Sequence, residues 1–191
     1  NVAGAGSEAK LPRNPVSVPG PEGQGLEFNG DNGVELPGGA AFDRFQPFSV
    51  SLWLRTPDHG PRYVIFHRSM AAEDAASRGY EFLLLDGKPT FSLSHFWPGN
   101  ALRVEAEQPL PVNAWTHCTI TYDGSSKASG VTIYVNGEPV ATKTVRDGLK
   151  KTILYDAGSE VTEPPLQLAM RFRDSGFKGG LIDSFKIFNR T

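Results

Sequence analysis

Few side chains in the sequence could support catalysis, and they form no known catalytic arrangement. Hydrolysis of a glycosidic bond needs two carboxyl groups, one on either side of that bond. Glu81 is the only carboxylate inside a clear strand pattern that could reach a concave sheet face. Cys118 and His117 should point in opposite directions along one strand, so they cannot form a nucleophile–base pair. We therefore expect no enzymatic activity, and a glycoside hydrolase is the least favoured alternative.

The four histidines allow two interpretations. His67, His95 and His117 would form a zinc site if neighbouring strands brought their rings together, because imidazole is a common zinc ligand. Alternatively, these imidazoles are isolated groups that form hydrogen bonds on a polar sheet face. We favour the second interpretation.

Side chains that could recognise a sugar occur in one loop and on one side of several strand patterns. The loop 94–100 holds two aromatic residues, and alternation in 48–55, 115–122 and 166–172 leaves basic and aromatic groups opposite the core. In the last of these patterns, alternation turns Phe172 inward. Aromatic rings stack on the C–H faces of sugars, and polar groups bond their hydroxyls. The predicted ligand-binding residues are Trp97, His95, Phe96, Arg171, His117 and Arg55.

These residues also have structural alternatives. Phe96 and Trp97 could pack against the domain instead of contacting a ligand. Arg171 could pair with Asp174 or with Asp183. The sequence leaves both alternatives open.

The elements that would position these side chains are strands. Residues 48–55 alternate apolar and polar side chains, the pattern of a strand with one face in a core. The dipeptides at 86–87 (Asp-Gly) and 136–137 (Asn-Gly) each separate two apolar runs and predict hairpin turns. Only 69–77 has the character of a helical turn, too short for a crossover between parallel strands. We predict an all-β fold in which two antiparallel sheets stack as a β-sandwich.

Composition limits the domain organisation and the partners. The chain has 191 residues, 39% of them hydrophobic, which suits one sandwich-sized domain. Its net charge of −2 provides no basic surface for nucleic acid or for an anionic membrane. A single cysteine excludes an internal disulfide. Residues 1–24 are rich in Gly, Ala, Ser and Pro and are predicted to be a linker or a loosely docked arm, and 25–191 to be the sandwich domain.

A family resemblance rests on four segments in order, which are SLWLRT at 51–56, WTHCTITYDG at 115–124, VTIYVNGEPV at 131–140 and GGLIDSFKIFNRT at 179–191. They resemble the laminin G-like branch of the concanavalin A-like lectin and glucanase superfamily, which implies a jelly-roll sandwich in an extracytoplasmic protein. Further segments, such as RFRDSGFKGGLID, are similar to segments of domains in large planctomycete proteins that also carry cytochrome c-like domains. Glucanases of the superfamily carry Glu-x-Asp-x-Glu on one strand, and this sequence has no such run.

The resemblance also implies one structural calcium ion, held between an N-terminal turn and the aspartate of a terminal Gly-x-Ile-Asp motif. The corresponding ligands here are Asp183, Asp31 and Asn29. Alternation turns Asp183 towards an apolar layer, where a carboxylate needs a compensating partner. Calcium would be such a partner, and so would backbone N–H groups or an arginine such as Arg173.

These observations predict a non-catalytic binding module for carbohydrate, a polysaccharide in particular, within a larger extracytoplasmic protein. The alternative is a protein-interaction or spacer domain that contacts neighbouring domains of its own chain. We expect no nucleic acid and no membrane among its partners.

Overall fold

The computed structural model describes residues 8–38, 40–71, 77–155 and 163–191, and these form two antiparallel seven-stranded sheets. The first sheet has the order β1 (Val16–Gly20), β2 (Gly23–Glu27), β14 (Leu181–Phe188), β4 (Phe48–Arg55), β9 (Thr116–Tyr122), β10 (Val131–Val135) and β11 (Glu138–Pro139). The second has the order β12 (Thr142–Asp147), β8 (Asn100–Ala106), β7 (Lys88–Phe96), β6 (Gly79–Leu85), β5 (Tyr63–Arg68), β13 (Leu166–Leu168) and β3 (Val34–Leu36). The predicted all-β sandwich is confirmed.

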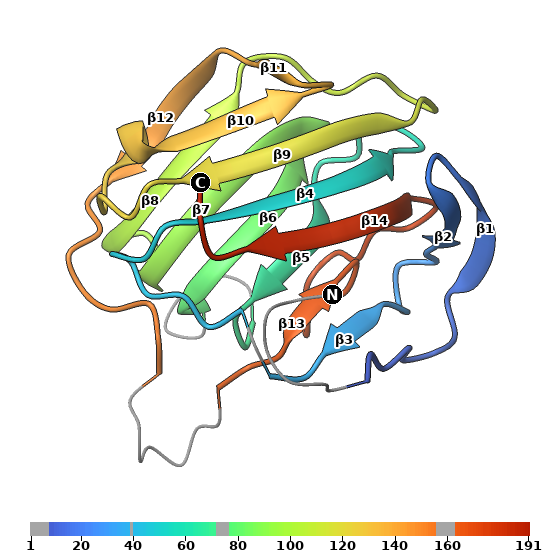
Figure 1. Ribbon diagram of the computed structural model, residues 1–191, viewed down its shortest axis with the longest axis horizontal. Helices are drawn as coiled ribbons and strands as arrows, with labels where there is room; N and C mark the ends of the chain where they lie inside the picture. The colour runs from blue at the N-terminus through green and yellow to red at the C-terminus, as the bar shows by residue number, and fades with distance from the viewer. Residues whose placement is uncertain (1–7, 39, 72–76, 156–162) are drawn as a thin grey trace.

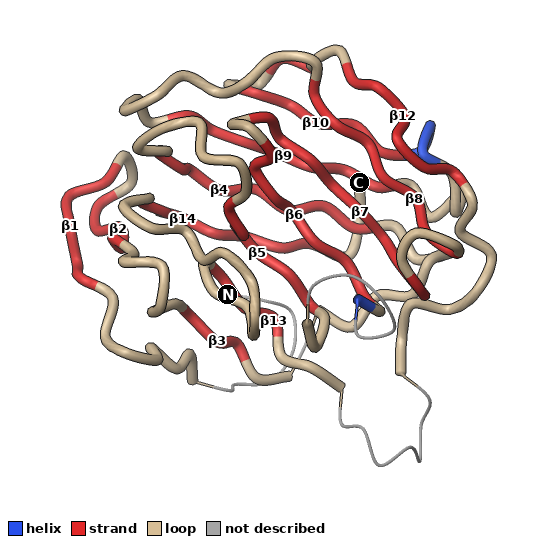
Figure 2. Tube along the Cα trace, turned by 180° about the vertical axis from the view of Figure 1, so that it is seen from behind, coloured by secondary structure: helices blue, strands red, loops and turns tan. Residues whose placement is uncertain are grey.

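The two sheets lie face to face. Figure 1 shows β4, β9 and β14 in front of β5 to β8, and Figure 2 shows the same layers from behind. Consecutive strands change sheets at several points, for example between β4 and β5 and between β8 and β9. A short 3₁₀ turn lies at Ala128–Gly130, and in the described part of the chain no helix has the length and apolar character to span a membrane.

The core lies between the sheets and follows the predicted alternation. Val50, Leu52 and Leu54 of β4 are 0% exposed. Phe48 of the same strand meets Phe91 of β7 edge to face, with ring centroids 6.1 Å apart, and so connects the two sheets. Complete burial of a side chain of this size contributes about 1.5–3 kcal/mol to stability.

Both predicted hairpin turns are present. Asp86 and Gly87 join β6 to β7 with φ angles of 49° and 76°. Asn136 and Gly137 join β10 to β11 with φ angles of 53° and 87°. Two central residues with positive φ match the right-handed twist of the flanking strands, and Asp-Gly and Asn-Gly tolerate this conformation best. The predicted helical turn at 69–77 falls largely on residues 72–76, outside the described residues.

The segment predicted to be a linker or arm contributes the edge strand β1 and the start of β2. Residues 1–7 lie outside the described part of the chain, but Lys10 exchanges backbone hydrogen bonds of 2.8 and 2.9 Å with Glu35 of β3. β1 pairs with β2, and β2 pairs with β14 through Glu27 and Leu181. β1 is largely exposed, so its residues lack the apolar alternation by which a half-buried strand is recognised.

The outer face of the second sheet is partly covered. Phe82 and Leu84 of β6 belong to the core between the sheets, so Glu81 and Leu83 point to the outer face. Leu83 is nevertheless 0% exposed and Glu81 only 9% exposed. Segments outside the sheet therefore cover this region, and its polar residues need partners within the protein.

Candidate functional site

The chain leaves the strand conformation directly after Leu168. β13 ends there, and Ala169 has a φ angle of 63°, which breaks the alternation that the sequence predicts through residue 172. As a result Arg171 is 5% exposed and Phe172 is 66% exposed. The prediction that Phe172 points into the core is therefore wrong, because one left-handed residue reverses the direction of the side chains that follow it.

Arg171 lies in a buried charged cluster on the outer face of the second sheet. Its Nη1 donates to Glu81 Oε2 at 2.6 Å, and Arg103 Nη2 donates to Glu81 Oε1 at 2.8 Å. Arg171 Nε also donates to Asp174 Oδ2 at 2.8 Å. Burial opposes ionisation of Glu81, but Arg171 and Arg103 outweigh it and hold the pKa of this carboxyl below its ordinary value.

The aromatic loop joins this cluster through Trp97. The Arg103 guanidinium lies over the Trp97 ring, 3.6 Å from its centroid, and Arg103 Nε donates to Ser92 Oγ at 2.7 Å. His95 Nδ1 contacts the Thr152 carbonyl at 2.7 Å, which requires a proton on Nδ1. Phe96 is 45% exposed. His95 and Trp97 thus have partners within the protein, whereas Phe96 presents its ring to solvent. Ligand binding by these three residues stays a prediction.

The remaining predicted ligand residues lie on the other sheet. Arg55 Nε donates to the Asn113 carbonyl at 3.1 Å. His117 Nε2 contacts Ser51 Oγ at 2.9 Å, and its ring centroid lies 5.1 Å from that of Trp53. Since β4 and β9 belong to the first sheet, and both residues point away from its core, they cannot share one site with Arg171 and Trp97.

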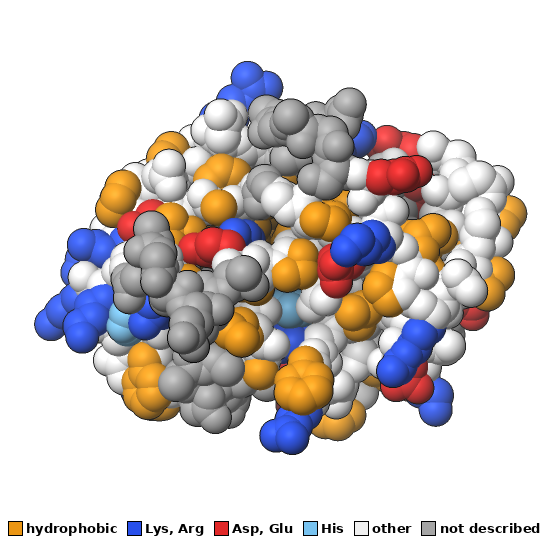
Figure 3. All heavy atoms as spheres, turned by 90° about the horizontal axis from the view of Figure 1, so that it is seen from below, with side chains coloured by type: hydrophobic (Ala, Val, Ile, Leu, Met, Phe, Trp, Pro, Cys, Tyr) orange, Lys and Arg blue, Asp and Glu red, His pale blue; other side chains and the backbone are white. Residues whose placement is uncertain are grey.

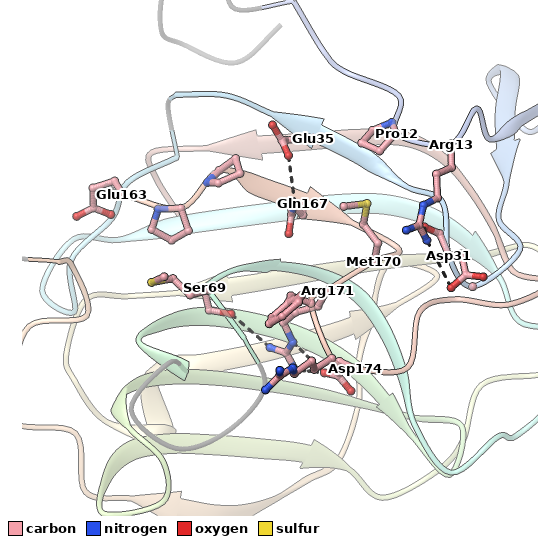
Figure 4. A pocket seen from close by; sticks show the side chains of 16 residues that line it. Pro12, Arg13, Asp31, Glu35, Ser69, Glu163, Gln167, Met170, Arg171 and Asp174 are labelled. Carbon is pink, nitrogen blue, oxygen red and sulfur yellow. Dashed lines mark hydrogen bonds and ion pairs between the residues drawn. The ribbon is translucent and has the colours of Figure 1, made fainter. Parts of the chain in front are cut away.

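A large open hollow adjoins the charged cluster. Its volume is about 820 Å³, and it is formed by β3, β13 and the segments 12–13, 30–31, 69–70, 163–165 and 170–174. Figure 4 shows Arg171 and Asp174 on one side of the hollow, Glu35 and Gln167 on another, and Arg13 with Asp31 at one end. Phe172 also lines it. On the face seen in Figure 3, hydrophobic side chains are interspersed with basic and acidic ones.

Each carboxylate that lines the hollow in the described part of the chain has a cationic partner. The pairs are Asp174 with Arg62 at 2.7 Å, Glu163 with Arg68 at 2.7 Å, Glu35 with Lys10 at 3.4 Å and Asp31 with Arg13 at 3.7 Å. Burial alone would raise the pKa of the Asp174 carboxyl. Its hydrogen bonds to Arg62 and the charge of Arg171 have the opposite and larger effect, so this pKa lies below its ordinary value. Such pairing stabilises the ionised form of each carboxylate.

His67 is buried behind the hollow and bonds two of its lining residues, Ser69 and Met170. Its Nε2 lies 2.9 Å from the Met170 carbonyl and donates to it, and its Nδ1 accepts from the Ser69 N–H at 3.2 Å. Burial, followed by the charge of Arg171, lowers the pKa of this imidazole to about 3, so the ring is neutral at pH 7. The zinc interpretation receives no support, since no three His, Cys, Asp or Glu residues cluster in a metal-binding group in the described ranges.

Two of the predicted calcium ligands, Asp183 and Asn29, accept hydrogen bonds from backbone N–H groups. Asp183 is 6% exposed, and its Oδ2 accepts from the Glu22 N–H at 2.9 Å, one of the alternatives that the sequence left open. Asn29 Oδ1 accepts from the N–H groups of Asp31 and Asn32 at 2.9 and 3.0 Å. The three predicted ligands line three different hollows. Calcium binding stays a prediction that unfolding with and without calcium would check.

Several residues of the hollow and of the adjoining charged cluster are not predicted as such from the sequence. Alternation predicts Phe172 in the core, and no sequence pattern assigns a role to Arg103. A lone strand carboxylate such as Glu81 is more often a member of a salt bridge than a catalytic group, and Glu81 does pair with two arginines. The one available signal was the polar residues Glu81, Ser92 and Arg103 at alternating positions of apolar strands.

Comparison with known proteins places the fold. A laminin G-like family model, described as the concanavalin A-like lectin/glucanases superfamily, matches residues 28–191. The chain belongs to this superfamily. The superfamily model thus covers β3 to β14 and begins after β1 and β2. A search of curated protein sequences gives no significant match.

Several solved structures share the superfamily fold. The chain is similar to the binding domain of Paraclostridial Mosquitocidal Protein 1 (TM-score 0.67, 17% identity, 96% of this chain and 44% of that one). It is also similar to the binding domain of botulinum neurotoxin serotype G (TM-score 0.67, 16% identity, 98% and 44%). A third is domain 4 of AbnA, a GH43 extracellular arabinanase from Geobacillus stearothermophilus, in complex with arabinotriose (TM-score 0.61, 19% identity, 95% and 82%). The chain thus spans less than half the length of the first two.

Proposed function

We propose that the domain is a non-catalytic carbohydrate-binding module and that the 820 Å³ hollow is its binding site. The observation that carries the proposal is Phe172, whose ring is 66% exposed beside polar groups that include Gln167. Exposure of a large ring costs hydrophobic free energy, and it is useful where a ligand covers the ring. A sugar can stack its C–H face on Phe172 while amide, carboxylate and guanidinium groups bond its hydroxyls.

The charge pairing around the hollow supports binding without hydrolysis. A glycosidase needs one carboxyl group that holds a proton and delivers it to the leaving oxygen. Asp174, the most deeply buried carboxylate of the hollow, is bonded to Arg62 and Arg171 and remains ionised. Such a group can accept hydrogen bonds from sugar hydroxyls, but it cannot act as the general acid.

The solved structures with the same fold support the proposal. The arabinanase domain was crystallised with arabinotriose, and the two toxin structures are named as binding domains. By analogy, we propose a polysaccharide as the ligand and an extracytoplasmic location for the larger protein. Neighbouring domains would carry any catalysis.

A protein-interaction module is the second candidate. Both methionines of the chain, Met70 and Met170, line the hollow, and Met70 is 47% exposed. Flexible methionine side chains adapt to varied apolar partners and are common at protein-binding surfaces. A peptide segment is the occupant that this feature would suit.

The test compares Phe172→Ala with Phe45→Ala. Phe45 is 63% exposed but does not line the hollow, so its variant controls for the loss of an exposed ring. Wild-type protein should show a higher melting temperature with at least one member of a panel of neutral and acidic polysaccharides, since a ligand of the folded state stabilises it. Phe172→Ala should weaken that binding about tenfold, which corresponds to roughly 1.4 kcal/mol. Phe45→Ala should bind like wild type.

Two results would contradict the proposal. If no polysaccharide binds to correctly folded protein, the carbohydrate function is wrong and the protein-interaction candidate replaces it. If both variants bind a polysaccharide as tightly as wild type, the ligand site lies elsewhere, and the exposed Phe96 is the next position to substitute.

A further inference from the structure

The described lining of the hollow holds four carboxylates and three arginines. Its four carboxylates all have cationic partners, as described above, and three of those cations, Lys10, Arg62 and Arg68, are not themselves lining residues. Arg173, by contrast, is exposed and forms neither an ion pair nor a hydrogen bond with another described residue. Its guanidinium lies over the Phe172 ring, whose centroid is 5.1 Å from the Arg173 Cζ.

The backbone at Arg173 is unfavourable for an arginine. Its φ angle is 55°, in the left-handed region, where a residue with a Cβ is disfavoured and Gly or Asn is the usual choice. Arg13, the other exposed arginine of the hollow, has a φ angle of 57°. Left-handed non-glycine residues concentrate at ligand-binding positions, where the side chain is needed despite the strain.

We infer that Arg173, with Arg13 as a second contact, forms an anion-binding subsite and that the ligand of the hollow is an acidic polysaccharide. The inference rests on the proposed carbohydrate function and adds the chemical class of the sugar. A guanidinium binds carboxylate or sulfate oxygens with two parallel hydrogen bonds. The Phe172 ring beside it would stack on the same sugar unit, which orients the charged substituent towards Arg173.

The test uses pairs of polysaccharides that differ in charge alone. Polygalacturonate and its methyl ester share one backbone, as do a sulfated carrageenan and the neutral polymer made from it by desulfation. Affinity gel electrophoresis measures each dissociation constant for wild type and for Arg173→Asn. Asparagine tolerates the left-handed backbone, so this variant should melt at or above the wild-type temperature. Arg190→Asn is the matched control, since it removes an exposed charge outside the hollow.

The expected result is preferential binding of a charged polysaccharide over its neutral counterpart. Arg173→Asn should weaken that binding about five- to tenfold, the range for an exposed guanidinium that bonds an anion. Its affinity for the neutral counterpart should not change, and Arg190→Asn should match wild type. Salt raised from about 0.05 to about 0.5 M should weaken charged binding by wild type more than by Arg173→Asn, because salt screens exposed charges.

The outcomes separate the two levels of the argument. Preference for the carboxylated or for the sulfated polymer supports the inference and identifies the oxyanion. Equal affinity for charged and neutral partners, unchanged in Arg173→Asn, overturns the inference but leaves the carbohydrate function intact. Binding to none of the polymers overturns both.

Discussion

The neutral imidazole of His67 makes the stability of the domain depend on pH. Its pKa is lowered to about 3 from an ordinary value of 6.5. Between these values the unfolded chain binds one proton more than the folded protein at this position. Because the folded pKa is the lower one, the stabilisation is complete above pH 6.5 and is lost as pH falls, by about 1.4 kcal/mol per pH unit.

The prediction concerns the difference between wild type and His67→Gln. From pH 7.5 to pH 5, His67 should remove about 2 kcal/mol of unfolding free energy from wild type. Glutamine does not titrate, and it can still donate to the Met170 carbonyl. The two stability profiles should therefore converge by that amount as pH falls. Urea denaturation at each pH measures the free energy, and the range stops at pH 5 because Glu81 and Asp174 titrate below it.

Parallel profiles would refute the reasoning, because they would mean that His67 titrates alike in the folded and unfolded states. The other histidines are present in both proteins, so their contributions cancel in the comparison. If His67→Gln does not fold, NMR titration of wild type decides the question. The ring resonances of His67 should then show no protonation down to about pH 4.

Three further substitutions test the packing that holds the site. Glu81→Gln should lower the unfolding free energy by about 3–5 kcal/mol, because it leaves two buried guanidinium groups without their carboxylate. A loss under about 1 kcal/mol, measured by urea titration, would show that the cluster is solvated. Gly20→Ala would place a Cβ 2.4 Å from Asp183 Oδ2 and should lower the unfolding free energy by about 1–3 kcal/mol. In the control Gly148→Ala the new Cβ would lie 3.7 Å from its nearest neighbour, so this variant should melt like wild type. Equal melting temperatures for the two variants would contradict this prediction. Leu52→Ala should cost about 2–5 kcal/mol, and a smaller loss would mean that the core collapses into the cavity.

Local features of the sequence were sufficient for the sandwich itself. The alternation of Val50, Leu52 and Leu54 reflects a period of two, which depends only on strand geometry. The Asp86-Gly87 turn needs positive φ at both positions, and few residue pairs adopt that conformation. Features of this kind are properties of neighbouring residues, so they are visible without knowledge of the rest of the chain.

The sequence predicts only part of the candidate site, because the residues of the site come from distant segments of the chain. Arg171 and Trp97 are predicted as ligand residues from the sequence, but their link through Glu81 and Arg103 joins β6, β8 and the segment after β13. No local pattern predicts which strands become neighbours, since consecutive strands such as β4 and β5 lie in different sheets. For the same reason, His117 was grouped with residues that lie on the opposite face of the molecule.

The sequence by itself determined the alternating core strands such as β4, the tight turns and the superfamily of this protein, because each depends on residue types over short distances. The tertiary structure alone decided that Phe172 is exposed, since the reversal at Ala169 is set by how the chain packs after β13 and not by alanine's own preference. It also decided which charges are paired. Glu81 and Asp174 neutralise the buried Arg171 through contacts between distant segments, whereas Arg173, two residues later, lies over the Phe172 ring. The residue type alone does not separate these two arginines.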